Sequence, residues 1–212
     1  MDAEDFLETV RDARATELHR LGSDKYLIAA TSADLADGPV LASVARTATS
    51  GVERFESWAD HESGAAAETF AAAADTERDH RRRLAERLAD ADAAVPDDPG
   101  DDAVHAALAE AATTAERAGA LVGRGLVADR TRLQVVNFFV NEGDSPGADF
   151  VRELRSDAND QVEAGADLLE AVCDDEDDWT VARDSVGRVV AAAYDEYASA
   201  LEAMGVDPKP VC

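Results

Sequence analysis

The chain has 212 residues, which is enough for one domain with a single hydrophobic core. Its 46 Asp and Glu residues against 20 Lys and Arg residues give a formal net charge of -26. The acids are spread along the whole chain, which argues against binding of DNA or RNA through a basic patch. The chain has neither a signal-peptide pattern at its start nor an apolar run long enough to cross a membrane, so we expect no membrane partner.

The choice of residue types is also informative. Lysine occurs only at Lys25 and Lys209, Ile28 is the sole isoleucine, and alanine replaces larger aliphatic residues along most of the chain. This composition resembles that of proteins from salt-in halophiles, where molar salt shortens the Debye length to about 3 Å and screens self-repulsion. Two cysteines without a disulfide or zinc pattern fit a cytoplasmic protein. An acidic surface that docks a basic partner is the alternative.

Helical periodicity without alternating β-branched runs predicts an all-α fold. We expect a single domain over 1–206, followed by a loose tail over 207–212. The first helix is predicted over 3–21, ended by Gly22, and the second begins after Ser23 and runs to about residue 36.

Two further helices are predicted over 39–60 and 64–94. The turn between them is so short that they must form an antiparallel hairpin. The second helix places Glu77 and His80 on its apolar stripe, whose members recur every three or four residues: Phe70, Ala73, Glu77, His80, Leu84 and Leu88. Polar groups at core positions must be satisfied by hydrogen bonds, by each other or by a metal ion.

The segment 96–100, Pro-Asp-Asp-Pro-Gly, is predicted to break the helical pattern. Asp101 or Asp102 then caps a helix that runs to about residue 122. Glycines weaken the helical pattern there, at Gly119, Gly123 and Gly125. The sequence leaves two interpretations open, because 102–122 is either a crossover between hairpins or the first half of a kinked helix.

A second hairpin is expected to follow, with one helix ending near residue 141 and the next over 148–173. A last helix is predicted over 179–204. The chain therefore contains two hairpins in tandem, with additional helices at both ends.

The second helix of the first hairpin resembles that of rubrerythrins, which are members of the ferritin-like superfamily. The similar residues are Glu68-Thr69-Phe70, Asp75-Thr76-Glu77-Arg78-Asp79-His80 and Arg83-Leu84. The resemblance implies a ferritin-like four-helix bundle over about 39–173. It also implies two iron or manganese ions in the core, held by a Glu from each of two helices and an ExxH motif from each of the other two. Such a centre performs redox chemistry on peroxide or dioxygen.

Only part of that ligand set is present in this chain. Glu77 and His80 form the first ExxH motif, and the resemblance places Asp157 and Asp160 where the second motif has Glu and His. Asp129 falls close to the level of Asp157 and stands for one helix glutamate, while Ala48 occupies the place of the other. We therefore expect a partial or degenerate centre that holds iron or manganese, or no metal.

Several alternatives remain at this stage. Glu77 and His80 are also consistent with a hydrogen-bonded polar pair in the core. The chain is then a non-enzymatic bundle that acts in self-association or in binding a protein of unknown identity; in either case we expect a homo-oligomer. Whether the protein is a metal-dependent oxidoreductase is left open by the sequence.

Overall fold

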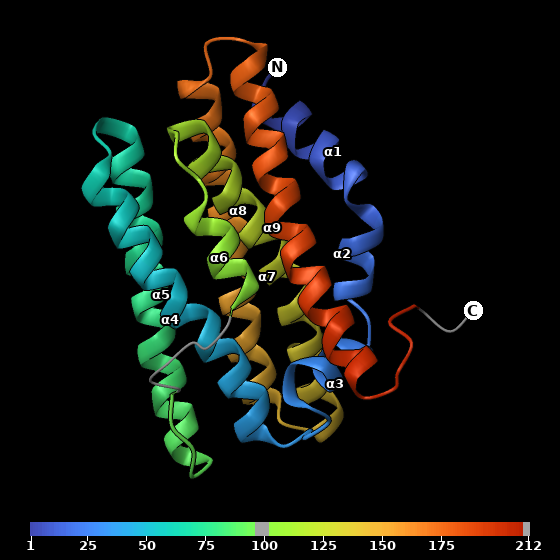
Figure 1. The fold of residues 1–212 in the computed structure, drawn as a ribbon. Helices are drawn as coiled ribbons and strands as arrows, with labels where there is room; N and C mark the ends of the chain where they lie inside the picture. The colour runs from blue at the N-terminus through green and yellow to red at the C-terminus, as the bar shows by residue number, and fades with distance from the viewer. Residues whose placement is uncertain (96–101, 210–212) are drawn as a thin grey trace.

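The computed structural model describes residues 1–95 and 102–209 (Figure 1). Within these ranges the chain forms helices and no strand, which confirms the all-α prediction. The helices are α1 (Ala3–Ala13), α2 (Ala15–Leu21), α3 (Lys25–Thr31), α4 (Asp37–His61), α5 (Gly64–Asp90), α6 (Ala103–Ala109), α7 (Thr114–Glu142), α8 (Ser145–Val172) and α9 (Glu176–Ala203). The predicted breaker at 96–100 and the candidate cap Asp101 lie outside the described residues.

The two expected hairpins are present. Helices α4 and α5 pair along one side of the molecule, and α7 pairs with α8 behind them (Figure 1). Helix α9 packs along α7, and the short α6 contacts α4, α7 and α9. The N-terminal helices α1 to α3 lie against the α7, α8 and α9 side of the bundle.

The apolar stripe of α5 faces the interior as predicted. All six of its members are buried: Phe70, Ala73, Glu77, His80, Leu84 and Leu88. Leu84 and Leu88 join a cluster with α4, α7 and α8, whereas Phe70 and Ala73 belong to a second cluster that reaches α1 and α9. Glu77 and His80 therefore lie between two apolar layers.

The glycines on α7 do not interrupt the helix, and the predicted helix over 102–122 is instead divided between α6 and α7. Helix α7 begins at Thr114, after the N-cap Thr113, whose hydroxyl and backbone form a reciprocal capping box with Glu116. The glycines instead face neighbouring helices. A Cβ at Gly123 would lie 3.1 Å from Val186 on α9, and one at Gly125 would lie 2.9 Å from the carbonyl oxygen of Ala158 on α8. These positions let three backbones approach closely.

The N-terminal region also differs from the expectation of long helices. The predicted helix over 3–21 is divided at Arg14 into α1 and α2, because α1 packs on α8 and α9 while α2 follows α9 and α7. Helix α3 ends early, where Ser32 and Ala33 adopt left-handed backbone conformations.

The start of the predicted loose tail is attached to α3. Lys25 donates hydrogen bonds from Nζ to the carbonyl oxygens of Asp207 (2.8 Å) and Lys209 (2.6 Å). Residues 210–212 lie outside the described part of the chain. Among the described helices, none combines the length and apolar character that crossing a bilayer requires.

Candidate functional site

Glu77 is fully buried at the junction of the two hairpins. Its Oε1 accepts hydrogen bonds from Arg124 Nη1 at 2.8 Å and from Gln161 Nε2 at 3.0 Å. Arg124 also donates from Nη2 to the carbonyl oxygen of Thr47 at 2.9 Å, so one guanidinium joins α4, α5 and α7. The carboxylate of Glu77 is thus bound by a charged partner and an amide, both nearly inaccessible to solvent.

A second buried arginine lies on the other side of the carboxylate. Arg132 Nη2 is 4.0 Å from Glu77 Oε2, and Nη1 donates to the carbonyl oxygen of Leu154. His80 Nδ1 is 3.6 Å from the same Glu77 oxygen. The opposite nitrogen of His80, Nε2, forms a 2.8 Å hydrogen bond with Asp157 Oδ2 on α8. The imidazole therefore lies between two carboxylates from different hairpins.

A glycine on α4 makes room for this cluster. A Cβ at Gly51 would lie 2.5 Å from Arg124 Nη2 and 3.1 Å from Glu77 Cγ, which is closer than packed atoms tolerate. The Arg124 guanidinium also stacks over Phe55, with 5.1 Å between Cζ and the ring centroid. From the sequence, Ala48 takes the place of a metal-binding glutamate on this helix. In the structure, Gly51 is the α4 residue that leaves room for the Arg124 side chain.

The environment of Glu77 stabilises its ionised form. Burial by itself would raise the pKa of Glu77, but Arg124, His80 and Arg132 together hold this pKa well below its ordinary value. Burial lowers the pKa of Arg132, an effect that Glu77 opposes. Among the described residues, three buried atoms of the cluster have no hydrogen-bond partner. One is the carboxylate oxygen Glu77 Oε2, and the other two, His80 Nδ1 and Arg132 Nη2, lie 3.6 and 4.0 Å from it.

These contacts do not fit the two-metal centre that the resemblance implies. Two guanidinium groups already neutralise Glu77, and a divalent cation beside them would be repelled. Across residues 1–95 and 102–209, no three His, Cys, Asp or Glu side chains converge in a group suited to a metal ion. The chemistry of this cluster is that of a compensated buried carboxylate.

Of the other predicted metal ligands, only one lies near Glu77 and His80. Asp157 lies next to His80, with 2.8 Å between Oδ2 and Nε2, and its side chain is 38 % exposed. Asp129 instead pairs with Arg155 at 2.8 Å and accepts a hydrogen bond from Asn159, so it joins α7 to α8 away from Glu77. Asp160 is exposed. The structure therefore brings together Glu77, His80 and Asp157, but not Asp129 or Asp160.

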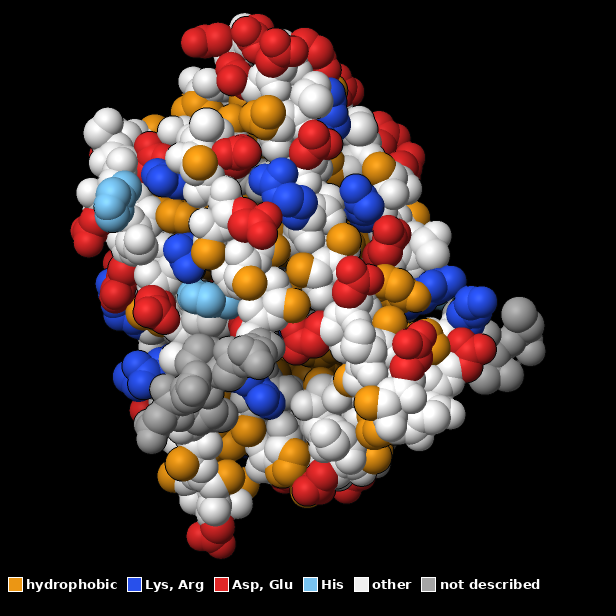
Figure 2. Space-filling model, in the orientation of Figure 1, with side chains coloured by type: hydrophobic (Ala, Val, Ile, Leu, Met, Phe, Trp, Pro, Cys, Tyr) orange, Lys and Arg blue, Asp and Glu red, His pale blue; other side chains and the backbone are white. Residues whose placement is uncertain are grey.

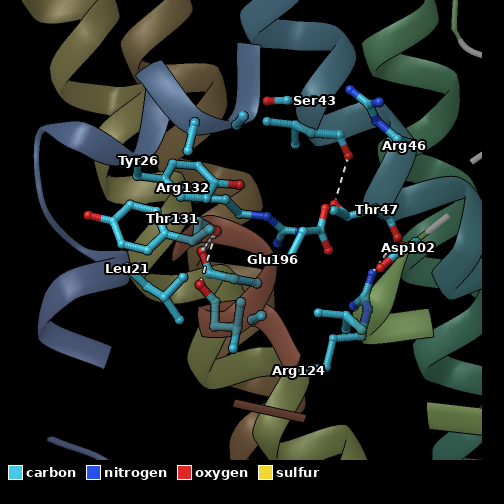
Figure 3. Close-up of a pocket in the computed structure, with 18 of the residues that line it drawn as sticks. Leu21, Tyr26, Ser43, Arg46, Thr47, Asp102, Arg124, Thr131, Arg132 and Glu196 are labelled. Atoms are coloured by element: carbon cyan, nitrogen blue, oxygen red, sulfur yellow. Dashed lines mark hydrogen bonds between the residues drawn. The ribbon is translucent and has the colours of Figure 1, made fainter. Parts of the chain in front are cut away.

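A cavity of about 340 Å³ adjoins the cluster (Figure 3). Its wall comes from α2, α3, α4, α6, α7 and α9, and it includes both Arg124 and Arg132 but not Glu77. The two guanidinium groups therefore separate the buried carboxylate from the cavity. In Figure 2 the corresponding face is hollowed between these helices, and acidic and arginine side chains are interspersed over the surrounding surface.

The cavity has a mixed lining. Its apolar wall includes Leu21, Val44, Leu108, Val127 and Val135. Tyr26, Arg132 and Glu196 point into the same space in Figure 3. Burial raises the pKa of Tyr26 to about 12, so its hydroxyl is a neutral donor. Burial and then the nearby Asp102 raise the pKa of Glu196, which is accessible at the mouth of the cavity.

Arg124, Arg132 and Tyr26 were not among the residues singled out from the sequence. One signal was available, because Arg124, Ala128 and Arg132 are spaced four residues apart and therefore share one helical face. Because arginine is not a metal ligand, this pattern does not belong to the metal centre that the resemblance implies. Tyr26 had no distinguishing neighbours in sequence.

Comparison of the chain with known protein families, characterised proteins and solved structures gives no match. The candidate site therefore rests on its own geometry.

Proposed function

We propose that this protein is a metal-independent helical bundle that binds a small organic ligand in the cavity lined by α2, α3, α4, α6, α7 and α9. The observation that carries the proposal is that Arg132, 2 % exposed, lines this cavity and makes one hydrogen bond to the described residues, while its Nη2 is buried without a hydrogen-bond partner among them. A guanidinium has five N–H donors, and burying them without acceptors is costly. A ligand that supplies acceptors in the cavity would offset that cost.

The size and lining of the cavity support the same proposal. Small-molecule sites are concave, mainly apolar and fitted with a few convergent polar groups, and they begin at about 300 Å³. The cavity matches this description with its aliphatic wall and its arginine, tyrosine and threonine side chains. We infer that α4, α5, α7 and α8 form a ferritin-like bundle in which two arginines occupy the centre, because the ExxH pair of α5 faces the second hairpin at Asp157.

Binding of simple probes tests the ligand-binding function. Backbone amide NMR spectra recorded in molar KCl with octanoate, octanamide or octanol should shift resonances of α3, α7 and α9 around the cavity. The variant Ala128→Leu fills cavity space and should abolish these shifts, whereas Ala72→Leu, at an exposed position on α5, should retain them. Absence of shifts with all three probes would refute the proposal.

Metal analysis tests the competing redox function. We expect protein incubated with iron or manganese and then desalted to retain less than one ion per chain, and to melt at the same temperature with and without a chelator. His80→Ala should give the same metal content. Stoichiometric metal that is lost in His80→Ala would favour the redox function instead. Self-association, a protein partner and a cytoplasmic location stay predictions from the sequence.

A further inference from the structure

The charges that face the cavity are not evenly compensated. Arg124 is engaged by Glu77, Gln161 and the carbonyl oxygen of Thr47. Arg132 also faces Glu77, but at 4.0 Å, and its recorded hydrogen bond goes to a neutral carbonyl oxygen. Two buried guanidinium groups thus share one buried carboxylate. Asp157 also acts on Arg132, but it is partly exposed and hydrogen-bonded to His80. Among the described residues, the inner wall of the cavity therefore presents a buried guanidinium, that of Arg132, with no carboxylate within hydrogen-bond distance.

The mouth of the cavity has the opposite character. Asp102 and Glu196 line it on the α6 and α9 side, with the exposed Arg46 across from them on α4. Asp102 accepts a hydrogen bond from Ser50, and Glu196 accepts one from the backbone of Ala103. A ligand with a second anionic group near the mouth would be repelled there. The arrangement favours one negative charge, located at the inner end.

From this distribution we infer that the cavity takes an amphipathic monocarboxylic acid. Its carboxylate would face Arg132 and accept a hydrogen bond from the Tyr26 hydroxyl, and its apolar part would contact Leu108 and Val127. A carboxylate matches the planar fork of a guanidinium and carries only one charge. A phosphate ester carries up to two charges, which exceeds the single charge of Arg132.

The volume sets the size of the acid. At roughly 30 Å³ for each water-sized group, the cavity holds about ten non-hydrogen atoms. Octanoate has about this number, and octanamide has the same shape without the charge. Comparing the affinities of octanoate and octanamide therefore shows how much binding depends on the carboxylate charge and how much on filling the apolar space. This inference rests on the proposed ligand-binding function, and the two probes separate the failure of one from the failure of the other.

The experiment compares dissociation constants by titration in molar KCl. We expect octanoate to bind at least about tenfold more tightly than octanamide, because the carboxylate adds a charge opposite to that of Arg132, whereas the amide accepts a hydrogen bond without one. Arg132→Met should remove this preference while octanamide still binds. Arg81→Met, at an exposed position on α5 outside the cavity lining, should leave the ratio nearly unchanged.

A second variant keeps the test decisive if Arg132→Met does not fold. Tyr26→Phe removes one hydroxyl and should weaken octanoate about fivefold, with a smaller effect on octanamide. Equal binding of the two probes to the wild-type protein would overturn the carboxylate inference but preserve the ligand-binding function. Tighter binding of octyl phosphate than octanoate would overturn the choice of a monocarboxylate. No binding of any probe would overturn both proposals.

Discussion

Glu77 keeps its negative charge in the interior because two guanidinium groups and an amide surround it. Arg124 and Gln161 bind one carboxylate oxygen at 2.8 and 3.0 Å, and Arg132 approaches the other. Buried ion pairs of this kind do not stabilise a fold greatly compared with apolar packing, but removing one partner leaves an uncompensated charge. The cluster therefore constrains which side chains are tolerated together.

Replacement of the carboxylate should expose that constraint. Glu77→Gln leaves Arg124 and Arg132 without a negative partner, so we expect the free energy of unfolding to fall by about 3–5 kcal/mol. Urea denaturation in molar KCl, followed by circular dichroism, measures the change. The control is Glu56→Gln, which removes a solvent-exposed partner of Arg78 and should leave the midpoint unchanged. A midpoint for Glu77→Gln equal to that of wild type would contradict the ion-pair description.

The same carboxylate should contribute to acid sensitivity. Its native pKa lies well below the ordinary value of 4.5, so its contribution is present above about pH 4.5 and is lost as the pH falls toward the native pKa. In urea denaturation at successive pH values, the stability of wild type should therefore decrease more steeply below pH 4.5 than that of Glu77→Gln. Parallel curves for the two proteins would show that Glu77 binds its proton equally in the folded and unfolded states.

At the scale of elements, helix α7 organises the bundle. It pairs with α8 on one side and with α9 on the other, and it supplies both arginines of the cluster. Glycines at the contact points shorten the distance between helices, since a Cβ at Gly119 would collide with the backbone of Ala182. Intrinsic helix propensity and close packing therefore oppose each other along this helix.

Gly125→Ala tests which effect dominates. Alanine favours a helix by up to about 1 kcal/mol over glycine. A Cβ at position 125 would also lie 2.5 Å from Val162 Cγ2 and 2.9 Å from a carbonyl oxygen of α8. Because overpacking typically costs about 1–3 kcal/mol, we expect a net loss of stability in thermal or urea unfolding. Gly38→Ala, where the nearest contact is an ordinary 3.4 Å, should show no loss. A stabilised Gly125→Ala would mean that α7 and α8 lie farther apart.

The first hairpin meets the second through polar pairs as well as apolar contacts. Glu77 with Arg124 and His80 with Asp157 join them at the centre, and Arg83 with Glu153 joins α5 to α8 at the surface. Other arginines of α5 also pair with carboxylates: Arg78 with Glu56 and Asp75, Arg82 with Asp79 and Glu86, and Arg87 with Asp144. Docking of the hairpins therefore depends on charge.

For the whole molecule, the dominant physical fact is the net charge of -26. Figure 2 shows acidic side chains distributed over the drawn face rather than gathered in one patch. Mutual repulsion of such a surface destabilises the compact state unless salt screens it. Arg124 and Arg132 are positive groups inside this acidic molecule. An anionic ligand would therefore be repelled by the outer surface but attracted at the inner wall of the cavity.

Salt removal should consequently unfold the chain. On dialysis from molar KCl into dilute buffer, we expect the helical circular dichroism signal to decrease and to recover when KCl is restored. Sucrose at matched osmolality should restore less of the signal, because it does not screen charge. Full helicity retained in dilute buffer would contradict the inference of adaptation to high salt.

Much of the secondary structure could be read from the sequence. The stripe of α5 predicted that Glu77 and His80 are buried, and short turns predicted both hairpins, because periodicity and loop length are local properties. The start of α7 was missed although Thr113 and Glu116 carry a capping signal, since one continuous helix was predicted over 102–122. A glycine in a helical pattern either weakens the helix or allows a neighbouring helix to approach closely. Only the tertiary structure shows which of the two applies.

The sequence by itself determined the all-α class, the two hairpins and the core position of the Glu77 and His80 pair. Only the tertiary structure decided what those two residues meet: Arg124 and Arg132 from α7, Gln161 and Asp157 from α8, and the space left by Gly51. A helical pattern reports which face is buried, but it does not report which distant side chain lies opposite. That choice depends on the register between hairpins and on side-chain reach across them, and here it placed guanidinium groups around the carboxylate.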